Sequence, residues 1–314
     1  MTNMKIDKIK GLIAATFTPF DKSGKVNISL IPSLASSLKT QGISGAFIAG
    51  TTGEGAALTL SEKLDLIKAW APFSSEDFKV ISMLGGTNQK EAIELAMAAQ
   101  ENGLYATALT APYYMRPTSV EQLLDYIQPI AEAAPDLPLY FYHIPLLSKV
   151  ELSMLDFLKL AGERIPNFAG IKYTHNDLME FNRCLRFEEG KYDILWGWDE
   201  TMLAGLAMGA KGAVGSTYNY AGSLYQEILL AFNNNEIEKA RQLQEKSIEM
   251  ISLFGKYGGA ACGKAIMKIC GLDCGQFRLP VKQLKDQDYE TLQRDLLSID
   301  VLEYLVPSQS AKKV

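Results

Sequence analysis

The sequence predicts an α/β protein, a (β/α)8 TIM barrel with a C-terminal helical extension. Two observations lead to this prediction. Strand-like and helix-like segments alternate eight times between residue 11 and about residue 235. The strand segments are short and almost continuously apolar, as expected for a parallel sheet that helices cover. Eight such units favour closure into a barrel, and a barrel of ~250 residues forms a single domain.

The predicted strands are bounded by polar and turn residues, and the predicted helices follow them after short connections. The strands are expected at residues 12–17, 45–50, 80–84, 106–111, 138–144, 168–175, 192–198 and 212–216. The helices are expected at 28–40, from 59, at 89–102, from 119 to about 134, around 153–161, and at 178–186, 201–208 and 223–233. Thr59-x-x-Glu62 and Ser119-x-x-Gln122 fit capping boxes at two of the helix starts.

An open dinucleotide-binding sheet is the main alternative to a barrel. It would carry Gly-x-Gly-x-x-Gly after the first strand, where this chain has Thr16-x-Thr18-Pro19-Phe20. After residue 235 the alternation ends, and helices are expected at 236–256, 260–270 and 286–298. The predicted domains are therefore a catalytic barrel at 1–235 and a helical bundle at 236–314, packed on the barrel. The polar residues from Ser308 onwards are expected to fray.

Composition excludes several classes of function. The 314 residues carry a net charge of −5 without a basic block, so nucleic acid is not an expected partner. No apolar run approaches the ~20 residues of a membrane span, and no signal-peptide core follows Met1–Lys5, so a cytoplasmic location is expected. The four cysteines lack a CxxC pattern and are interpreted as reduced core thiols. With two histidines, His143 and His175, no metal site is predicted.

Lys172 lies inside the apolar sixth strand segment. A lysine is rarely buried without a partner or a function. Burial disfavours its charged form, and a neutral amine is a nucleophile that forms Schiff bases with carbonyl substrates. The alternative is a lysine at a strand end whose amine extends to solvent.

Further unusual residues fall at the C-terminal ends of the strands, where the active site of such a barrel lies. Glycines flank two threonines in the segment 50–55, which indicates an anion cradle made of amides and hydroxyls. It is not a P-loop, because no Gly-Lys-Ser/Thr follows. The alternative is a glycine turn capped by threonine.

Alternation along the fifth strand puts Tyr140, Tyr142 and Ile144 on one face and Phe141 and His143 on the other. A tyrosine that faces the barrel interior beside Lys172 is placed to carry a proton to or from a reacting hydroxyl. The alternative is an aromatic core residue with a satisfied hydroxyl. His143 is expected to be a core histidine.

Acids and hydroxyls end the last two strands. Asp199 and Glu200 follow the seventh strand, and Ser216 follows the eighth. Two such acids are suited to bind a polyhydroxyl chain, or alternatively cap the next helix. The lysine, the tyrosine, the anion cradle and these acids and hydroxyls together fit a carbonyl substrate with a carboxylate and several hydroxyls.

Four motifs carry a resemblance to a known family. They are Gly50-Thr51-Thr52-Gly53-Glu54, Tyr142-His143-Ile144-Pro145, Gly170-Ile171-Lys172 and Gly215-Ser216-Thr217-Tyr218-Asn219. They resemble the N-acetylneuraminate lyase branch of the pyruvate-dependent class I aldolases, whose superfamily includes dihydrodipicolinate synthase. The similarity runs in order from about Gly11 to Leu279. It implies a homotetramer of barrels that uses no cofactor beyond a covalent Schiff base.

The resemblance also implies roles for individual residues. Lys172 would form the Schiff base with pyruvate, Thr51 and Thr52 would hold the pyruvate carboxylate, and Tyr142 would transfer the proton. Tyr114 matches a tyrosine that related synthases extend across a subunit interface. The positions that match contacts to the sugar are Thr174, Gly197, Asp199, Glu200 and Ser216.

One departure separates the branches of this superfamily. The synthases carry an arginine two residues after the proline of the strand-five motif, and here that place is Leu147. A second substrate carboxylate would lack its cationic partner. The expected reaction is therefore cleavage of N-acetylneuraminate (sialic acid) to N-acetylmannosamine and pyruvate. The alternatives are another pyruvate-dependent aldolase or synthase, and a carbohydrate-binding barrel, which would be expected to lack Lys172 or Tyr142.

Overall fold

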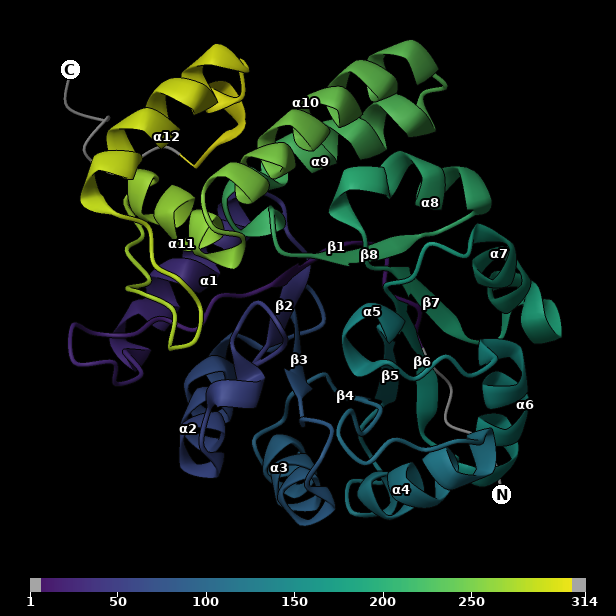
Figure 1. Ribbon diagram of the computed structural model, residues 1–314. Helices are drawn as coiled ribbons and strands as arrows, with labels where there is room; N and C mark the ends of the chain where they lie inside the picture. The colour runs from purple at the N-terminus through teal and green to yellow at the C-terminus, as the bar shows by residue number, and fades with distance from the viewer. Residues whose placement is uncertain (1–6, 307–314) are drawn as a thin grey trace.

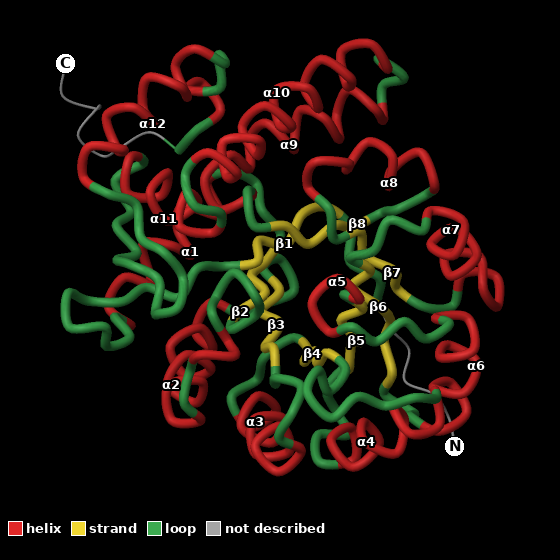
Figure 2. Tube along the Cα trace, in the orientation of Figure 1, coloured by secondary structure: helices red, strands yellow, loops and turns green. Residues whose placement is uncertain are grey.

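In the computed structural model, which describes residues 7–306, eight parallel strands form a closed barrel. Each strand pairs with its neighbour in sequence, and β8 closes the ring against β1 (Figure 1). The helices surround the strands, as Figure 2 shows. The predicted (β/α)8 barrel is therefore confirmed. The strands are β1 Gly11–Ala15, β2 Gly45–Ile48, β3 Lys79–Met83, β4 Ala106–Thr110, β5 Leu139–His143, β6 Phe168–Tyr173, β7 Asp193–Trp196 and β8 Gly212–Gly215.

Strand alternation creates two separate apolar cores, one inside the barrel and one between barrel and helices. On β5, Tyr140 and Tyr142 belong to the inner core, whereas Phe141 belongs to the outer one. His143 packs against the rings of Phe141 and Tyr173. The predicted alternation along this strand is confirmed, and it directs Tyr142 into the barrel.

The outer layer consists of helices that bury one face against the strands. The helices of the βα units are α1 Ile31–Thr40, α2 Leu60–Trp70, α3 Gln89–Glu101, α4 Val120–Glu132, α5 Pro145–Ser148, α6 Met154–Arg164, α7 Leu178–Arg186, α8 Met202–Met208 and α9 Tyr218–Asn233. Short 3-10 turns lie at Ile28–Leu30, Gly55–Ala57, Ala71–Phe73, Phe187–Gly190, Asp199–Thr201 and Leu302–Tyr304. Between residues 7 and 306, no helix is long and apolar enough to cross a membrane.

Both predicted capping motifs lie at helix starts, but only one is complete. At α2 the Glu62 amide donates to the Thr59 hydroxyl, and the Thr59 amide donates to the Glu62 carboxylate at 2.9 Å. At α4 the Gln122 amide donates to the Ser119 hydroxyl, but the Gln122 side chain accepts from the amide of Thr118. The second motif is therefore half of a capping box.

Two helical elements differ from the prediction. The short helix α5 was not expected, and α9 begins at Tyr218 rather than at Ser223. The amide and hydroxyl of Thr217 donate to the Asp199 carboxylate at 2.9 and 2.7 Å just before α9. Such a cap stabilises the first turn of a helix, and its partner here lies 18 residues away in the chain. Local sequence patterns do not contain this contact.

The chain after residue 235 forms α10 Ile237–Lys256, α11 Ala260–Ile269 and α12 Asp286–Ser298. Figure 1 shows these helices on one side of the barrel. Tyr225 of α9 and Ser247 of α10 are joined by a hydrogen bond of 2.7 Å. The three predicted helices are confirmed, while the division into domains at 1–235 and 236–314 stays a prediction. The segment expected to fray, from Ser308, lies outside the described residues, as does Met1–Lys5.

A buried carboxylate lies at the N-terminal end of the barrel, opposite the face on which active sites form. Asp193 begins β7 and accepts hydrogen bonds from the Tyr140 hydroxyl at 2.8 Å and the Ile9 amide at 2.9 Å. Burial raises its pKa to about 6, although both hydrogen bonds oppose the shift. Asp193 thus connects three segments that are distant in sequence.

The four cysteines are free and buried. Burial raises the pKa of each thiol to about 12. Thiols in this state are unreactive, in agreement with the expected core role.

Candidate active site

Lys172 points into the barrel from β6. It is 4% exposed, and its register partners are Tyr142 on β5 and Leu195 on β7. Its amine lies 3.9 Å from the centroid of the Tyr142 ring and 4.4 Å from that of Phe47. Both rings belong to the apolar core inside the barrel. The lysine is therefore buried, and it does not extend to solvent.

The Lys172 amine has aromatic contacts but, within residues 7–306, neither a hydrogen-bond acceptor nor a carboxylate in ion-pair contact. Its charge lowers the pKa of Asp199, although burial has the larger effect and raises that pKa. Aromatic faces attract the cationic form of an amine without taking its protons. No hydrogen bond or ion pair with a described residue therefore has to be broken before the neutral form of this amine can react with a carbonyl carbon.

Tyr142 lies between Lys172 and a cavity. Its ring packs edge-on against Phe47, with centroids 5.9 Å apart. Its hydroxyl makes no hydrogen bond with any part of the chain that the structure describes, and its side chain lines the cavity. Tyr142 is thus a core aromatic residue whose hydroxyl has no partner among the described residues, so this hydroxyl is free to bind a substrate group.

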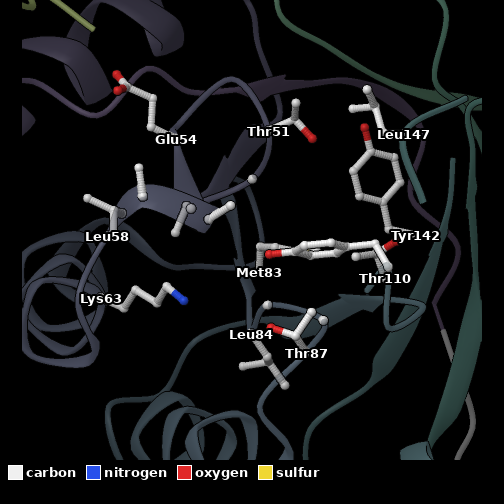
Figure 3. A pocket seen from close by; sticks show the side chains of 18 of the residues that line it. Thr51, Glu54, Leu58, Lys63, Met83, Leu84, Thr87, Thr110, Tyr142 and Leu147 are labelled. Atoms are coloured by element: carbon white, nitrogen blue, oxygen red, sulfur yellow. The ribbon is translucent and has the colours of Figure 1, made fainter. Parts of the chain in front are cut away.

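The cavity has a volume of about 530 Å³ and adjoins the C-terminal ends of β2 to β5. The segment Phe277–Val281 of the C-terminal extension forms part of its wall. Figure 3 shows Thr51, Tyr142 and Leu147 on one side and Lys63 on the opposite side. Lys172 does not itself line the cavity. Its amine lies against the ring of Tyr142, which does line it.

The loop after β2 has a compact backbone that requires glycine. The Gly55 amide donates to the Gly50 carbonyl at 2.9 Å. A Cβ added to Gly55 would lie 1.9 Å from the Ala49 carbonyl oxygen, so no larger residue fits without movement of the backbone. The Thr18 hydroxyl donates to the Gly53 carbonyl at 2.6 Å and holds the loop from the β1 side.

This loop carries Thr51 and Thr52, of which only Thr51 lines the cavity. Thr51 is exposed and lines the cavity, and Thr52 is half-buried. Neither hydroxyl has a hydrogen-bond partner among the described residues. Two hydroxyls on a glycine-rich turn are suited to bind a carboxylate.

Thr174 and Gly197 meet where β6 and β7 end. The Gly197 amide donates to the Tyr173 carbonyl at 2.9 Å, and the Thr174 amide donates to the His143 carbonyl at 2.8 Å. A Cβ on Gly197 would lie 1.9 Å from the Thr174 hydroxyl, which is buried and unpartnered within the described structure. An unpaired buried hydroxyl is costly for the fold, and a ligand hydroxyl would satisfy it.

The two acids after β7 differ in their surroundings. Asp199 is buried and binds Thr217, so it caps the start of α9 rather than the next helix, α8. Glu200 is half-buried, and burial raises its pKa. Ser216 lies beside Asp199, because its amide also bonds to that carboxylate. Among the described residues, the Glu200 carboxylate is hydrogen-bonded only by its own backbone amide.

Leu147 lies on α5, is more than half exposed and lines the cavity together with Tyr142. The place where the synthases carry an arginine is thus apolar in the folded protein. Two cations that sequence reasoning did not place there also line the cavity, Lys63 and Arg278. Arg278 is paired with Glu62, whereas Lys63 is buried and its pKa is lowered by burial.

Tyr114 does not reach the cavity of its own chain. It lies in the loop after β4 and is 80% exposed, and Met115 beside it is 81% exposed. Its neighbour Tyr113 does line the cavity. A role for Tyr114 in a site therefore requires a second chain.

His143 is a core residue, as expected. It is buried, it packs against Tyr173 and His175, and burial lowers its pKa to about 3. It is neutral at physiological pH. Between residues 7 and 306 no group of three or more histidine, cysteine or acidic side chains is placed to hold a metal ion.

Besides the two cations that line the cavity, sequence reasoning missed Phe47 and Thr110. Phe47 contacts both the Lys172 amine and the Tyr142 ring. Thr110 ends β4 opposite Tyr142, lines the cavity and has a buried hydroxyl without a partner in the described range. Thr110 is a polar residue at the end of an apolar strand, and this signal was available in the sequence.

Comparison with known proteins shows similarity over nearly the whole chain. Residues 8–299 match the Dihydrodipicolinate synthetase family. The N-acetylneuraminate lyase of Homo sapiens is 35% identical over 302 residues, which cover 95% of this chain and 94% of that protein. The structure of the Proteus mirabilis N-acetylneuraminate lyase gives a TM-score of 0.91 at 37% identity and covers 94% of this chain and 100% of that one. A dihydrodipicolinate synthase from Bacillus anthracis gives 0.86 at 29% identity, with coverages of 93% and 99%.

Proposed function

The chain belongs to the dihydrodipicolinate synthetase family, and we propose that within it this enzyme is a Schiff-base aldolase of N-acetylneuraminate. The reaction is the reversible cleavage of a carbon–carbon bond that yields N-acetylmannosamine and pyruvate. The names of the human and Proteus mirabilis relatives support this substrate. The structural observation that carries the proposal is the buried Lys172 amine, which contacts Tyr142 at the edge of a cavity.

Lys172 supplies the covalent step. Its amine adds to the keto carbon, C2, of open-chain N-acetylneuraminate, and loss of water leaves an iminium that links C2 to the lysine nitrogen. The iminium accepts an electron pair when the neighbouring bond breaks. It develops beside the faces of Tyr142 and Phe47, which stabilise a cation.

Tyr142 supplies the proton-transfer step. The proton of the C4 hydroxyl is removed through Tyr142 as the C3–C4 bond breaks, and a proton relayed by Tyr142 later returns to C3. The electron pair of the broken bond forms the C2=C3 double bond, and the C2=N pair moves to the nitrogen, which gives an enamine. N-acetylmannosamine then leaves. Protonation of C3 restores the imine, and its hydrolysis releases pyruvate and the free lysine. The iminium stabilises the negative charge that develops as the bond breaks, and stabilisation at that stage accelerates the reaction most.

Thr51 and Thr52 are proposed to bind the substrate carboxylate. Their hydroxyls have no competing partner among the residues described, and Thr51 faces the cavity beside Tyr142 (Figure 3). A carboxylate held there would place the adjacent keto carbon toward Tyr142 and Lys172. Binding of this kind orients the carbonyl for attack.

The sugar hydroxyls are proposed to bind at the ends of β6, β7 and β8. The Thr174 hydroxyl has no partner among the described residues, and the Glu200 carboxylate is bound only by its own backbone amide, whereas Asp199 is held by Thr217. Gly197 leaves room for the Thr174 hydroxyl. The proposed contacts are Thr174, Gly197, Asp199, Glu200 and Ser216.

The covalent link to Lys172 provides the electron sink, and we therefore propose that the reaction uses neither a metal nor a separate cofactor. A homotetramer in the cytoplasm is the proposed form of the enzyme. The exposed tyrosine and methionine after β4 support an interface, and Tyr114 is proposed to enter the site of a neighbouring chain.

A dihydrodipicolinate synthase-like reaction, or cleavage of another sugar acid, is the second candidate. It is favoured by the Bacillus anthracis neighbour and by Lys63, a cation on the cavity wall. It is opposed by Leu147, which leaves the place of the synthase arginine apolar.

The preference of the enzyme for one of two aldehydes separates these candidates. The values of kcat/KM for condensation of pyruvate with N-acetylmannosamine and with aspartate semialdehyde should be measured on one preparation, and the proposal expects N-acetylmannosamine to be preferred. A preference for aspartate semialdehyde would establish the synthase reaction. Binding without turnover of either aldehyde would indicate a carbohydrate-binding barrel.

A further inference from the structure

A buried ion pair joins the loop after β2 to the C-terminal extension, residues 236–306. The Lys264 amine of α11 lies 2.8 Å from Glu54, and the two side chains are 3% and 5% exposed. The other oxygen of the Glu54 carboxylate accepts a hydrogen bond from the Arg278 amide at 2.7 Å. Both oxygens of Glu54 are therefore held by the C-terminal extension.

Lys264 is enclosed as fully as Glu54. Its amine also donates to the Gln276 carbonyl at 3.2 Å and lies over the rings of Phe20 and Phe277, 4.4 and 4.6 Å from their centroids. Burial lowers the pKa of Lys264, and Glu54 acts in the opposite direction. A buried charge of this kind is tolerated only with its partner, so each residue depends on the other.

Glu54 occupies a backbone position that needs external support. Its φ of 58° lies in the left-handed region, which is unfavourable for a residue with a side chain. Its amide donates to the Thr51 carbonyl at 3.1 Å, and its carbonyl accepts from the Ala57 amide at 2.7 Å. The conformation of Glu54 therefore determines where Thr51 and Thr52 lie.

Thr51 and Glu54 both line the cavity, but the Glu54 side chain points away from Thr51 (Figure 3). The carboxylate of Glu54 therefore lies outside the space that the substrate carboxylate would occupy. Lys264 neutralises its charge, so the loop can present hydroxyls to an anion without a competing negative charge. Arg278 reinforces the same loop, because its guanidinium donates to the Ala57 carbonyl at 2.8 Å.

We infer that Lys264 and Glu54 are positioning residues for the substrate carboxylate, through which the C-terminal extension sets the affinity of the active site for pyruvate. The inference rests on the proposed function, in which Thr51 and Thr52 bind that carboxylate. Neither Lys264 nor Glu54 touches the substrate. Their action is on the backbone that places the two threonines.

Trapping with borohydride tests this inference. Glu54→Gln, Lys264→Met and the double variant are incubated with increasing pyruvate, and the reduced adduct on Lys172 is measured by mass spectrometry. The pyruvate concentration for half-maximal trapping should rise about tenfold or more in Glu54→Gln, because a charge-assisted contact that fixes the loop is lost. Adduct formation with acetone, a ketone without a carboxylate, should stay unchanged. The double variant should lose no more affinity for pyruvate than the single variant that has the larger loss.

Lys264→Arg, which keeps the positive charge, should restore much of the pyruvate affinity. Lys268→Met is the matched control, since Lys268 lies on the same helix in an exposed pair with Asp273. If Lys264→Met does not fold, the pyruvate affinity of Glu54→Gln decides the test, because glutamine keeps the shape of the glutamate side chain.

Three outcomes would count against the inference. Equal losses for pyruvate and acetone would show a general structural role, and unchanged pyruvate trapping in Glu54→Gln would show no role in binding. Either result overturns the inference alone, provided that the unmodified enzyme forms the pyruvate adduct on Lys172. Absence of that adduct would overturn the proposed function and this inference with it.

Discussion

Lys172 and Tyr142 are register partners on neighbouring parallel strands, with the lysine amine 3.9 Å from the centre of the tyrosine ring. Backbone hydrogen bonds between β5 and β6 therefore fix the distance between the proposed nucleophile and the proposed proton carrier. Groups held on strands keep their geometry better than groups on loops. This pairing leads to the first two predictions.

Lys172 should carry the covalent adduct. Borohydride reduction with pyruvate is expected to add a reduced pyruvyl group to the peptide that contains Lys172, and Lys172→Met should abolish both adduct and cleavage. Peptide mapping by mass spectrometry checks this. The informative contrary result is an adduct on Lys63, a buried lysine that lines the cavity.

Tyr142→Phe should retain the pyruvate adduct but lose turnover. The expected fall in kcat for cleavage is about 10² to 10⁴-fold, the usual contribution of a general acid–base group. Tyr113→Phe is the control, since it removes a different hydroxyl from the cavity wall. Near-normal turnover of Tyr142→Phe would mean that Tyr142 only packs, and loss of the adduct as well would assign it an earlier step.

Asp193 should make stability depend on pH. Burial raises its pKa from 3.8 to about 6, so the folded protein binds this proton more tightly than the unfolded chain does. Stability should therefore rise as the pH falls from about 6 to 4, and the contribution should be lost as the pH rises through 6. Relative to Asp193→Asn, the gain at pH 4 over pH 7 should be roughly 2 kcal/mol.

Urea unfolding of both proteins at pH 4, 5, 6 and 7 measures this difference. The side-chain amide oxygen introduced by Asp193→Asn can still accept hydrogen bonds from Tyr140 and Ile9, so the comparison isolates the charge. A stability difference that is independent of pH would show that Asp193 does not titrate in this window.

The loop after β4 should form an interface between chains. Tyr114 and Met115 are about four-fifths exposed, an unusual exposure for adjacent large apolar side chains. Light scattering is expected to give the mass of a tetramer, and Met115→Glu should shift it to smaller species. Met179→Glu, which alters another exposed methionine on α7, should leave the mass unchanged. A monomer at working concentration would contradict the prediction.

The parts of the fold that the sequence predicts are those set by local patterns. Short apolar runs determine the strands, and alternation along β5 directs Tyr142 and not His143 into the barrel. Lys172 could be found because a charged residue inside an apolar run is a local signal. The same holds for the glycines around Thr51, which permit a turn that other residues do not.

The features of the fold and the site that the sequence does not predict depend on contacts between residues that are distant in the chain. Phe277–Val281 forms a cavity wall, and Lys264 binds Glu54 across 210 positions of sequence. The start of α9 is fixed by Asp199, which lies 18 residues away in the chain. No single segment contains the information for these contacts.

The groups proposed for the donor and acceptor halves of the reaction lie in different parts of the barrel. Thr51, Tyr142 and Lys172 belong to β2, β5 and β6 or the loops after them. Of the proposed sugar contacts, Thr174 follows β6, and the other four follow β7 and β8. For biocatalysis, this separation recommends libraries confined to the loops after β7 and β8. Such variants would exchange the aldehyde that is joined to pyruvate, and stereochemically varied sugar acids would become accessible from one scaffold with an unaltered nucleophile.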